Sequence, residues 1–389
     1  MSNPSDTLSP AYNGLTELTA GLPASAYFDH DRYVAELRKI WQRNWIYVAR
    51  SSEIAGRRAF ATFEIGDQKM LLVRDDQGVL RGFYNTCRHR GALLCRESGG
   101  TLRSGAIVCP YHAWVYDLEG ALLRTSSKID AQGFDVADYP LYPIQVKEWR
   151  GFVFVALTDS PPPLERSFDM PLQRFDAWPL EDLRVAHTLR KTIACNWKIF
   201  WENYNECLHC PSVHPQLSAL VPIYGRGLLE ERDDPEWSSH ATDKDPKFKG
   251  GLRSGAESWT VGGALSGRPF PNVSTEDRAL GAVYLTGLPS IFLVGHADYV
   301  RVVRLWPLGP ERTQLTVEYL FSAESLADPS LDIAPAVEFT NRVMTEDAEV
   351  CELNQGGLKS SVHAQGVVMP EEYVIKQFHA WVNAELARP

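Results

Sequence analysis

The stretch "CRHRGALLCRESGGTLRSGAIVCPYHAW", from Cys87 to Trp114, holds three cysteines and two histidines of a 389-residue chain that has only 7 cysteines and 10 histidines. Four of these residues follow a pattern, Cys87-x-His89 and then Cys109-x-x-His112. Each loop offers one thiolate and one imidazole, whereas a simple zinc finger usually takes two cysteines from one knuckle and two histidines from another. This order favours a centre with two metal ions.

In a Rieske [2Fe-2S] cluster, one iron is bound by two cysteines and the other by two histidines. Two loops that each give one ligand to each iron satisfy this arrangement. We therefore predict that Cys87, His89, Cys109 and His112 bind a Rieske [2Fe-2S] cluster, and a structural zinc site is the alternative. Cys95 fits neither loop and is predicted to be a small buried residue.

The composition bounds the class of protein. With 44% hydrophobic residues, the chain can bury a large core and is expected to form two domains. A net charge of -10 without a Lys/Arg cluster argues against a nucleic-acid partner. We find no apolar leader and no run of about eighteen apolar residues, so we expect a cytoplasmic protein without a membrane partner. In that compartment, metal binding or burial is favoured over disulfides for the seven cysteines.

Hydrophobic periodicity divides the first half of the chain. The first twenty or so residues lack a period and predict a loosely held arm. "DHDRYVAELRKIWQRNW" has helical spacing, with Asp29 or Asp31 placed to cap the helix. From Trp45 to Leu157, short strands such as "KMLLVRD", "LRGFYNT", "GAIVCPY" and "RGFVFVAL" alternate with Gly/Asp turns, which predicts a small all-β domain.

The three prolines of "DSPPPLERSF" mark a boundary, and the chain beyond it mixes helices and strands. A helical segment is expected over 194–210, strands over 290–308 and 313–323, and helices after Ala334. The predicted fold class is α+β, with domains at 1–44 (arm and helix packing on the catalytic domain), 45–160 (Rieske domain) and 161–389 (catalytic domain). No GxGxxG follows a strand, so electrons must come from a nicotinamide or flavin on another protein.

"FYNTCRHRGALL" and "CPYHAWVYDLEG" resemble the two cluster loops of Rieske non-heme iron oxygenase α subunits, and "IWQRNWIYVARSSEI" resembles the start of their Rieske domain. The resemblance extends from about residue 30 to the C-terminus. It implies a larger catalytic domain of helix-grip, START-like fold with a mononuclear Fe(II). It also implies an O2-dependent mono- or dioxygenase that hydroxylates or demethylates a small molecule, served by an NAD(P)H-dependent flavin/iron-sulfur reductase.

"NWKIFWENYNECLHCPSVHP", from Asn196 to Pro215, is the candidate segment for that iron. An Fe(II) that binds O2 and substrate needs two histidines and one carboxylate on one side. We expect Pro211 and Pro215 to end a helix, so that His209 lies in its last turn and His214 just beyond. Taken alone, two histidines five residues apart are more often unrelated core or surface residues, and it is the Rieske loops that favour iron binding here.

The third iron ligand is sought in "VEFTNRVMTEDAEVCELNQGGL". Asp347 shares a helical face with Val343 and Cys351, whereas Glu346 and Glu349 fall on the polar side. A buried carboxylate needs a cation or several donors, which iron would supply. The family places its third ligand in this helix, so Asp347 is our assignment, and a salt-bridged surface aspartate is the alternative.

Glu206 is the candidate catalytic residue outside the iron ligands. It precedes His209 by three residues and is predicted to lie on the same helix face. In much of the family an Asp at this position hydrogen-bonds an iron-ligand histidine and the second-loop Rieske histidine of the neighbouring subunit. Here the residue is Glu, so we expect it to connect His209 to His112 of another chain in a head-to-tail homotrimer, or else to be a helix-surface glutamate.

The substrate class follows only from resemblance. "ENYNECLHCPSVHP" and "HADYVRVVRLWPLGPERT" most resemble the branch that acts on quaternary-ammonium compounds such as betaines, carnitine and choline. An ammonium group binds aromatic faces, but for each candidate ring taken singly, ordinary core packing is the more common role. These candidates are Tyr204, Trp259, Tyr284, Phe292 and Trp306. The alternatives are an aromatic ring-hydroxylating dioxygenase, an O-demethylase of an aromatic acid, and a Rieske electron carrier without catalysis.

Overall fold

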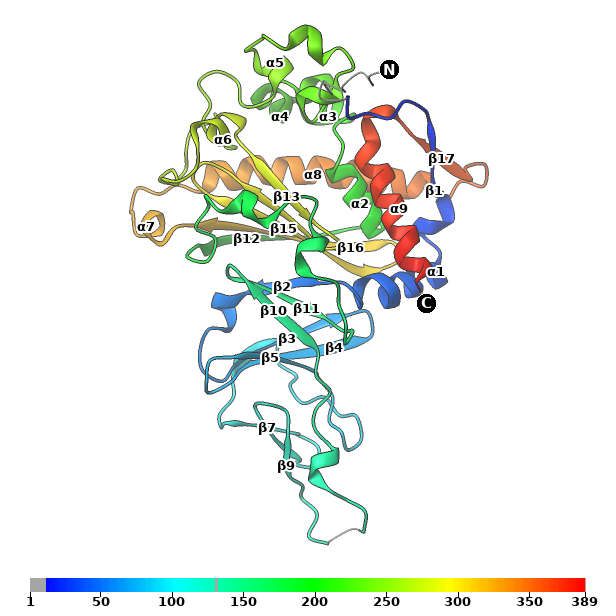
Figure 1. The fold of residues 1–389 in the computed structure, drawn as a ribbon, viewed down its shortest axis with the longest axis vertical. Helices are drawn as coiled ribbons and strands as arrows, with labels where there is room; N and C mark the ends of the chain where they lie inside the picture. The colour runs from blue at the N-terminus through cyan, green and yellow to red at the C-terminus, as the bar shows by residue number, and fades with distance from the viewer. Residues whose placement is uncertain (1–11, 130–131, 389) are drawn as a thin grey trace, which may run out of the picture.

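The computed structural model describes residues 12–129 and 132–388, which form an elongated molecule with a large mixed body and a narrow β lobe (Figure 1). The predicted arm lies partly outside the described residues, namely at 1–11. The described end of that arm is not loose, because β1 (Thr19–Pro23) pairs antiparallel with β17 (Gln365–Val368) near the other end of the chain.

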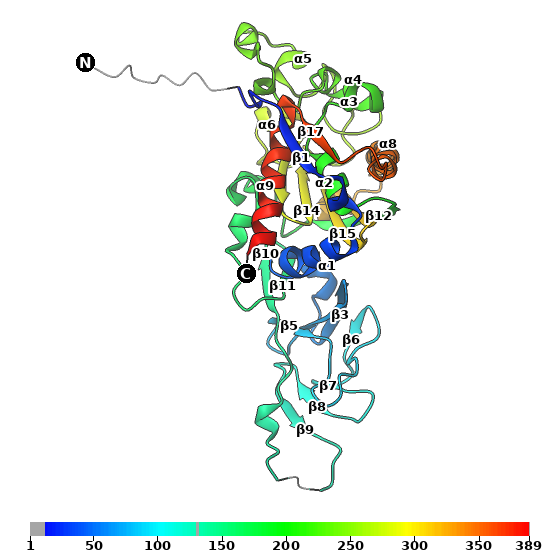
Figure 2. The same cartoon turned by 90° about the vertical axis from the view of Figure 1, so that its right-hand side faces the viewer.

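The predicted N-terminal helix is confirmed as α1 (His30–Glu36), which continues through a π-helical turn (Leu37–Trp41). Asp29, not Asp31, is its cap, since its carboxylate accepts a hydrogen bond from the backbone N–H of Arg32 at 2.7 Å. This helix packs on the large body, and the C-terminal end of α9 (Tyr373–Ala387) lies beside it (Figures 1 and 2).

The β lobe and the strands that join it to the body form three antiparallel sheets in the orders β10-β11-β2, β5-β4-β3-β6 and β7-β8-β9. All four strands predicted from short segments are present. The strands are β2 (Ile46–Arg50), β3 (Ala59–Ile65), β4 (Gln68–Arg74), β5 (Leu80–Tyr84), β6 (Gly99–Thr101), β7 (Ala106–Val108), β8 (Val115–Asp117), β9 (Leu122–Arg124), β10 (Gln145–Trp149) and β11 (Phe152–Ala156).

The large body is built on a five-stranded antiparallel sheet in the order β12-β16-β15-β14-β13. The strands are β12 (Arg184–Ile193), β13 (Val283–Gly287), β14 (Ile291–Gly295), β15 (Val300–Gly309) and β16 (Arg312–Phe321). The helices are α2 (Trp197–Tyr204), α3 (Cys210–Val213), α4 (Pro215–Leu220), α5 (Pro246–Lys249), α6 (Thr275–Leu280), α7 (Ala323–Leu326), α8 (Ala334–Gly357) and α9. The predicted α+β class is confirmed.

The two faces of this sheet are buried by different partners. Along β15, Val300 and Val302 pack into a core with β2 and β11, whereas Val303 and Leu305 pack into the core that contains α2 and α8. Alternation along the strand therefore aims Arg301 at the helix side. Within residues 12–129 and 132–388, no helix is long and apolar enough to span a bilayer.

Candidate active site and electron-transfer centre

The four residues predicted to hold the cluster meet where the loops flank β7 and β8. Cys87 and Cys109 are both buried in the core of the β lobe, and burial together with the nearby Cys109 thiol raises the pKa of Cys87. The rings of His89 and His112 lie 4.7 Å apart, close to perpendicular. The fold therefore pairs thiol with thiol and imidazole with imidazole, which is the donor set that a Rieske cluster requires.

Two neighbours of this centre were not singled out from the sequence. The Tyr116 hydroxyl accepts a hydrogen bond from the Arg88 N–H and lies 3.2 Å from the Cys87 Sγ. Trp114 stacks on the His89 ring at 4.9 Å. Cys95 is buried in the core of the lobe, as predicted, and burial raises the pKa of its thiol to about 11.

The prediction for the segment around His209 is wrong in its secondary structure. α2 ends at Tyr204, so His209 does not lie in its last turn but directly precedes α3, and His214 lies between α3 and α4. The reason is that Pro211 and Pro215 stand in the first turns of two new short helices, where a missing N–H costs nothing. Glu206 and His209 therefore share a turn rather than a helix face.

A second correction concerns the cysteines. Cys207 and Cys210 form a disulfide across the turn that carries His209, although burial or metal binding was expected for all seven cysteines. The two thiols are only three residues apart, and the turn after α2 brings them together. The disulfide closes a small ring that contains His209 and so restricts its backbone.

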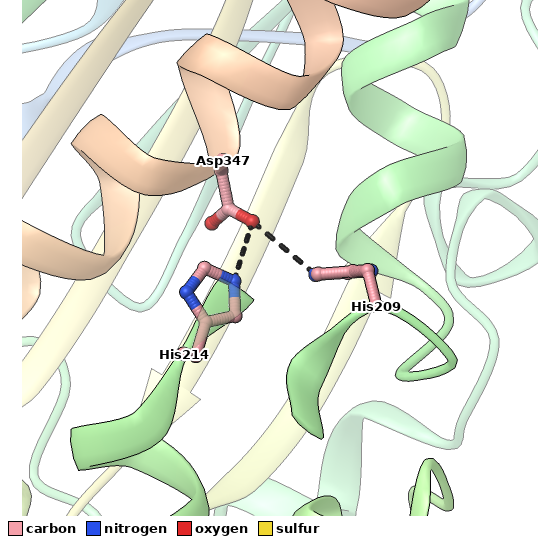
Figure 3. Close-up of side chains that lie close together, drawn as sticks. All are labelled: His209, His214 and Asp347. Carbon is pink, nitrogen blue, oxygen red and sulfur yellow. Dashed lines mark hydrogen bonds and ion pairs between the residues drawn. The ribbon is translucent and has the colours of Figure 1, made fainter. Parts of the chain in front are cut away.

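The three residues predicted to bind iron converge on one point (Figure 3). The Oδ1 atom of Asp347, on α8, lies 2.9 Å from the His214 Nε2 and 3.4 Å from the His209 Nε2. Their ligand atoms all lie within 4.8 Å of one another, and Asp347 is only 4% exposed. Two imidazoles and one carboxylate on one side match the facial triad of non-heme Fe(II), so the residues fit this ion.

Each histidine also has its own carboxylate on the opposite ring nitrogen. His209 Nδ1 lies 2.5 Å from Glu206 Oε1, and His214 Nδ1 lies 2.8 Å from Glu346 Oε2. A carboxylate that accepts the Nδ1–H fixes the ring and leaves Nε2 free as a metal ligand.

Glu346 was therefore missed, because helical periodicity assigned it only to the polar side of the helix. It precedes Asp347, and its longer side chain reaches round α8 to the other side of the His214 ring while remaining 25% exposed. Helical periodicity describes where a Cα–Cβ bond points, and it cannot report the reach of a flexible side chain.

The charges of the site depend on one another. Burial raises the pKa of Asp347, but the hydrogen bonds from His209 and His214 outweigh burial and lower it below its usual value. Burial lowers the pKa of His209, but the hydrogen bonds to Asp347 and Glu206 outweigh this effect and raise it to about 9. The carboxylates thus make this pair of imidazoles a strong site for a cation.

A cavity of about 430 Å³ opens onto the three residues. It is lined by five aromatic side chains, Tyr204, Tyr224, Trp259, Tyr284 and Tyr373. The ring of Trp259 is steeply inclined to its neighbours, at 79° to Tyr224 and 71° to Tyr284, with centroids 6.1 and 6.2 Å away. Tyr224 was not among the sequence candidates.

The other two aromatic candidates do not line this cavity. Phe292 is buried in the core against Tyr204, with ring centroids 4.3 Å apart. The Trp306 indole N–H donates to the backbone carbonyl of Glu64, next to a separate cavity. Only the tertiary contacts distinguish these rings from those of the cavity wall.

The two centres lie at opposite ends of one chain. Strands β7 and β9 lie in the part of the β lobe that is remote from the large body, whereas α3 and α8 belong to that body (Figure 1). Glu206 and His112 therefore do not approach each other within one subunit.

Comparison with protein families gives two matches. Residues 180–388 match the ring hydroxylating alpha subunit (catalytic domain), and residues 44–139 match the Rieske [2Fe-2S] domain.

Curated relatives extend over nearly the whole chain. The glycine betaine monooxygenase oxygenase subunit of Pseudomonas aeruginosa is 28% identical and the alignment covers 98% of this chain and 94% of the relative. The carnitine monooxygenase oxygenase subunit of Escherichia coli is also 28% identical, and the alignment covers 92% of this chain and 91% of that one.

Among solved structures, the fold is shared with a quaternary ammonium Rieske monooxygenase that has been described in terms of carnitine oxidation and inter-subunit electron transfer. The TM-score is 0.74 at 23% identity, over 95% of this chain and 96% of that chain.

Proposed function

Since the chain belongs to the family of ring-hydroxylating oxygenase alpha subunits, we propose that it oxidises a small quaternary-ammonium compound at the cavity beside His209, His214 and Asp347. As a Rieske oxygenase it is an oxidoreductase that consumes O2 and depends on a separate reductase. The observation that carries the substrate proposal is a cavity in which aromatic rings face a two-histidine, one-carboxylate site.

We assign the ligands of both metal centres as follows. A [2Fe-2S] cluster is held by Cys87, His89, Cys109 and His112, and Fe(II) is held by His209, His214 and Asp347. When bound, the cluster supplies single electrons and the iron supplies O2 activation. The chain's own contribution is to orient both iron-binding imidazoles through Glu206 and Glu346.

We further propose the domain division 1–44, 45–160 and 161–389. It is supported by the packing of α1 on the large body, by the three small β sheets between Ile46 and Ala156, and by the single five-stranded sheet beyond them.

The aromatic side chains that line the cavity support the proposal that the substrate carries an ammonium group. A quaternary ammonium ion is stabilised by the faces of Trp and Tyr rings, by about 2 kcal/mol where it is desolvated. The tyrosines remain neutral hydroxyls, because burial raises the pKa of Tyr224 to about 12 and that of Tyr284 still further. The cavity beside the proposed iron site, lined by rigid aromatic side chains, therefore suits a cation better than a flexible aliphatic pocket would.

The chemistry gives a direct test. Hydroxylation of a carbon next to a quaternary nitrogen consumes O2, two electrons and two protons, yields water, and leaves a carbinolamine that releases an aldehyde and a tertiary amine. We expect betaines to drive NADH-dependent O2 uptake with stoichiometric aldehyde when a surrogate reductase is supplied. Aldehyde-free uptake with an aromatic acid or a phenyl ether, and none with ammonium compounds, would instead support the aromatic alternative.

We also propose a head-to-tail homotrimer served by an NAD(P)H-dependent flavin/iron-sulfur reductase in the cytoplasm. The separation of the two centres within one chain supports electron transfer between subunits, and the hydrogen bond between Glu206 and His209 supports Glu206 as the link to His112 of the partner subunit. Mass measurement in solution tests the trimer. A monomer with full activity would contradict it.

A further inference from the structure

Arg301 is a buried cation that the fold leaves without a counter-ion. It lies on β15, is 2% exposed and lines the cavity. A guanidinium has five N–H donors. Its one hydrogen bond among the described residues goes from Nη2 to the Tyr204 hydroxyl at 3.2 Å, and its buried Nε has no partner. No described carboxylate forms an ion pair with it.

Two other buried arginines, Arg74 and Arg50, show which hydrogen-bond acceptors surround a guanidinium elsewhere in this fold. Arg74 forms two hydrogen bonds of 2.9 Å to Glu148, and its Nε donates to the Ile54 carbonyl. Arg50 donates to backbone carbonyls, among them that of Leu180 at 2.6 Å. Arg50 also has a buried Nε without a partner, but both of its Nη atoms donate to backbone carbonyls. Arg301 has only the Tyr204 hydroxyl, and a buried charge with so few partners is costly, so Arg301 is the buried arginine that most needs a ligand.

The surroundings of Arg301 place that ligand in the substrate cavity. The guanidinium lies 5.5 Å from the ring centroid of Trp259. Arg301 lines the same cavity as His209, His214 and Asp347, so the guanidinium and the proposed iron site share one space. The flat, forked donor set of arginine matches a carboxylate in two parallel hydrogen bonds.

We propose that Arg301 binds a carboxylate of the substrate, which makes the substrate a zwitterion with an ammonium group and a carboxylate. The inference rests on the proposed function, because it takes the cavity as the substrate site. It predicts discrimination against a purely cationic compound such as choline, since a lone ammonium group would enter beside the unpaired guanidinium and leave it unsatisfied.

The test is a panel of four compounds of similar shape, titrated calorimetrically into the anaerobic enzyme with both metals bound. Glycine betaine carries both groups, choline only the ammonium, 3,3-dimethylbutyrate only the carboxylate, and 3,3-dimethylbutanol neither. Removing one partner of a buried charge pair costs enough to weaken binding about 30-fold or more. We therefore expect wild-type protein to prefer glycine betaine over choline by at least that factor.

Arg301→Gln should abolish this preference by weakening the binding of both carboxylate compounds without weakening that of choline, and Arg301→Lys should restore part of the preference. Arg304→Gln is the matched control, because Arg304 lies on the same strand but stacks on Tyr47 and Trp306, outside this cavity.

Two results would overturn the inference. One is equal binding of glycine betaine and choline by the wild type, which needs no variant and so remains decisive if Arg301→Gln does not fold. The other is an equal loss of binding affinity for all four compounds in Arg301→Gln, which would mean that Arg301 only stabilises the aromatic side chains of the cavity. If 3,3-dimethylbutyrate or benzoate binds in an Arg301-dependent way while no ammonium compound binds, the carboxylate site stands and the ammonium proposal fails.

Discussion

Glu346 allows a quantitative test of how the iron site is built. Its Oε2 lies 2.8 Å from the Nδ1 of His214, which is itself 1% exposed. Replacing Glu346 with Ala removes this acceptor without touching a proposed metal ligand. Outer carboxylates of this kind typically contribute 10- to 100-fold in metal affinity, about 1.4 to 2.7 kcal/mol.

The structure narrows the expected loss of metal affinity. A hydrogen bond to a charged group contributes about 1.5 to 3 kcal/mol, but Glu346 is a quarter exposed, so water can replace part of the interaction. We expect Glu346→Ala to weaken Fe(II) binding about 10- to 30-fold. Glu346→Gln, which keeps a neutral acceptor, should lose about half of that free energy.

The assay is reconstitution of iron-depleted protein with Fe(II) against a competing chelator, with the iron content per chain as the readout. Glu349→Gln is the matched control, because Glu349 is an exposed acid on the same helix. The visible spectrum of the Rieske cluster reports the integrity of the β lobe. Unchanged iron affinity in Glu346→Ala would refute the reasoning, as would a loss as complete as that in His214→Ala.

Three further predictions concern the two centres and the fold around them. Alanine at any of the three proposed iron ligands should abolish turnover and mononuclear iron but keep the Rieske spectrum, and full activity in one variant would remove that residue from the set. Glu206→Gln should retain both metals and slow the reoxidation of pre-reduced enzyme in stopped flow, and an unchanged rate would exclude a bridging role. Lys198→Met should destabilise the protein by about 3 kcal/mol, because the buried Glu36 carboxylate loses the ammonium group that binds it at 2.7 and 2.8 Å and keeps only the Arg32 Nε at 3.2 Å and the Trp197 indole N–H at 2.9 Å. Chemical denaturation measures this loss, and Glu36→Gln added to Lys198→Met should recover most of it.

The amino-acid sequence alone was sufficient for the chemistry of the site and for the class of fold. Ligand types and spacing are local properties, and so Cys87, His89, Cys109 and His112 could be named as one group from two short loops. The inward face of α8 could be read from helical periodicity, which isolated Asp347 from the acids around it. The strands of the β lobe were equally predictable, because alternation and turn residues act over a few positions.

Only the tertiary structure showed how far individual side chains extend and which distant segments contact each other. The turn after α2, not a continued helix, brings Glu206 onto His209, and the flexible side chain of Glu346 crosses to His214 although its Cα lies on the other face. Alternation along β15 puts Arg301 and Arg304 on opposite faces of the sheet, but only the packing of the helices over one face shows that Arg301 lines a cavity. The sequence determined which groups this protein could use, and the folded chain determined which of them share one desolvated space, because burial and proximity arise only when remote segments pack together.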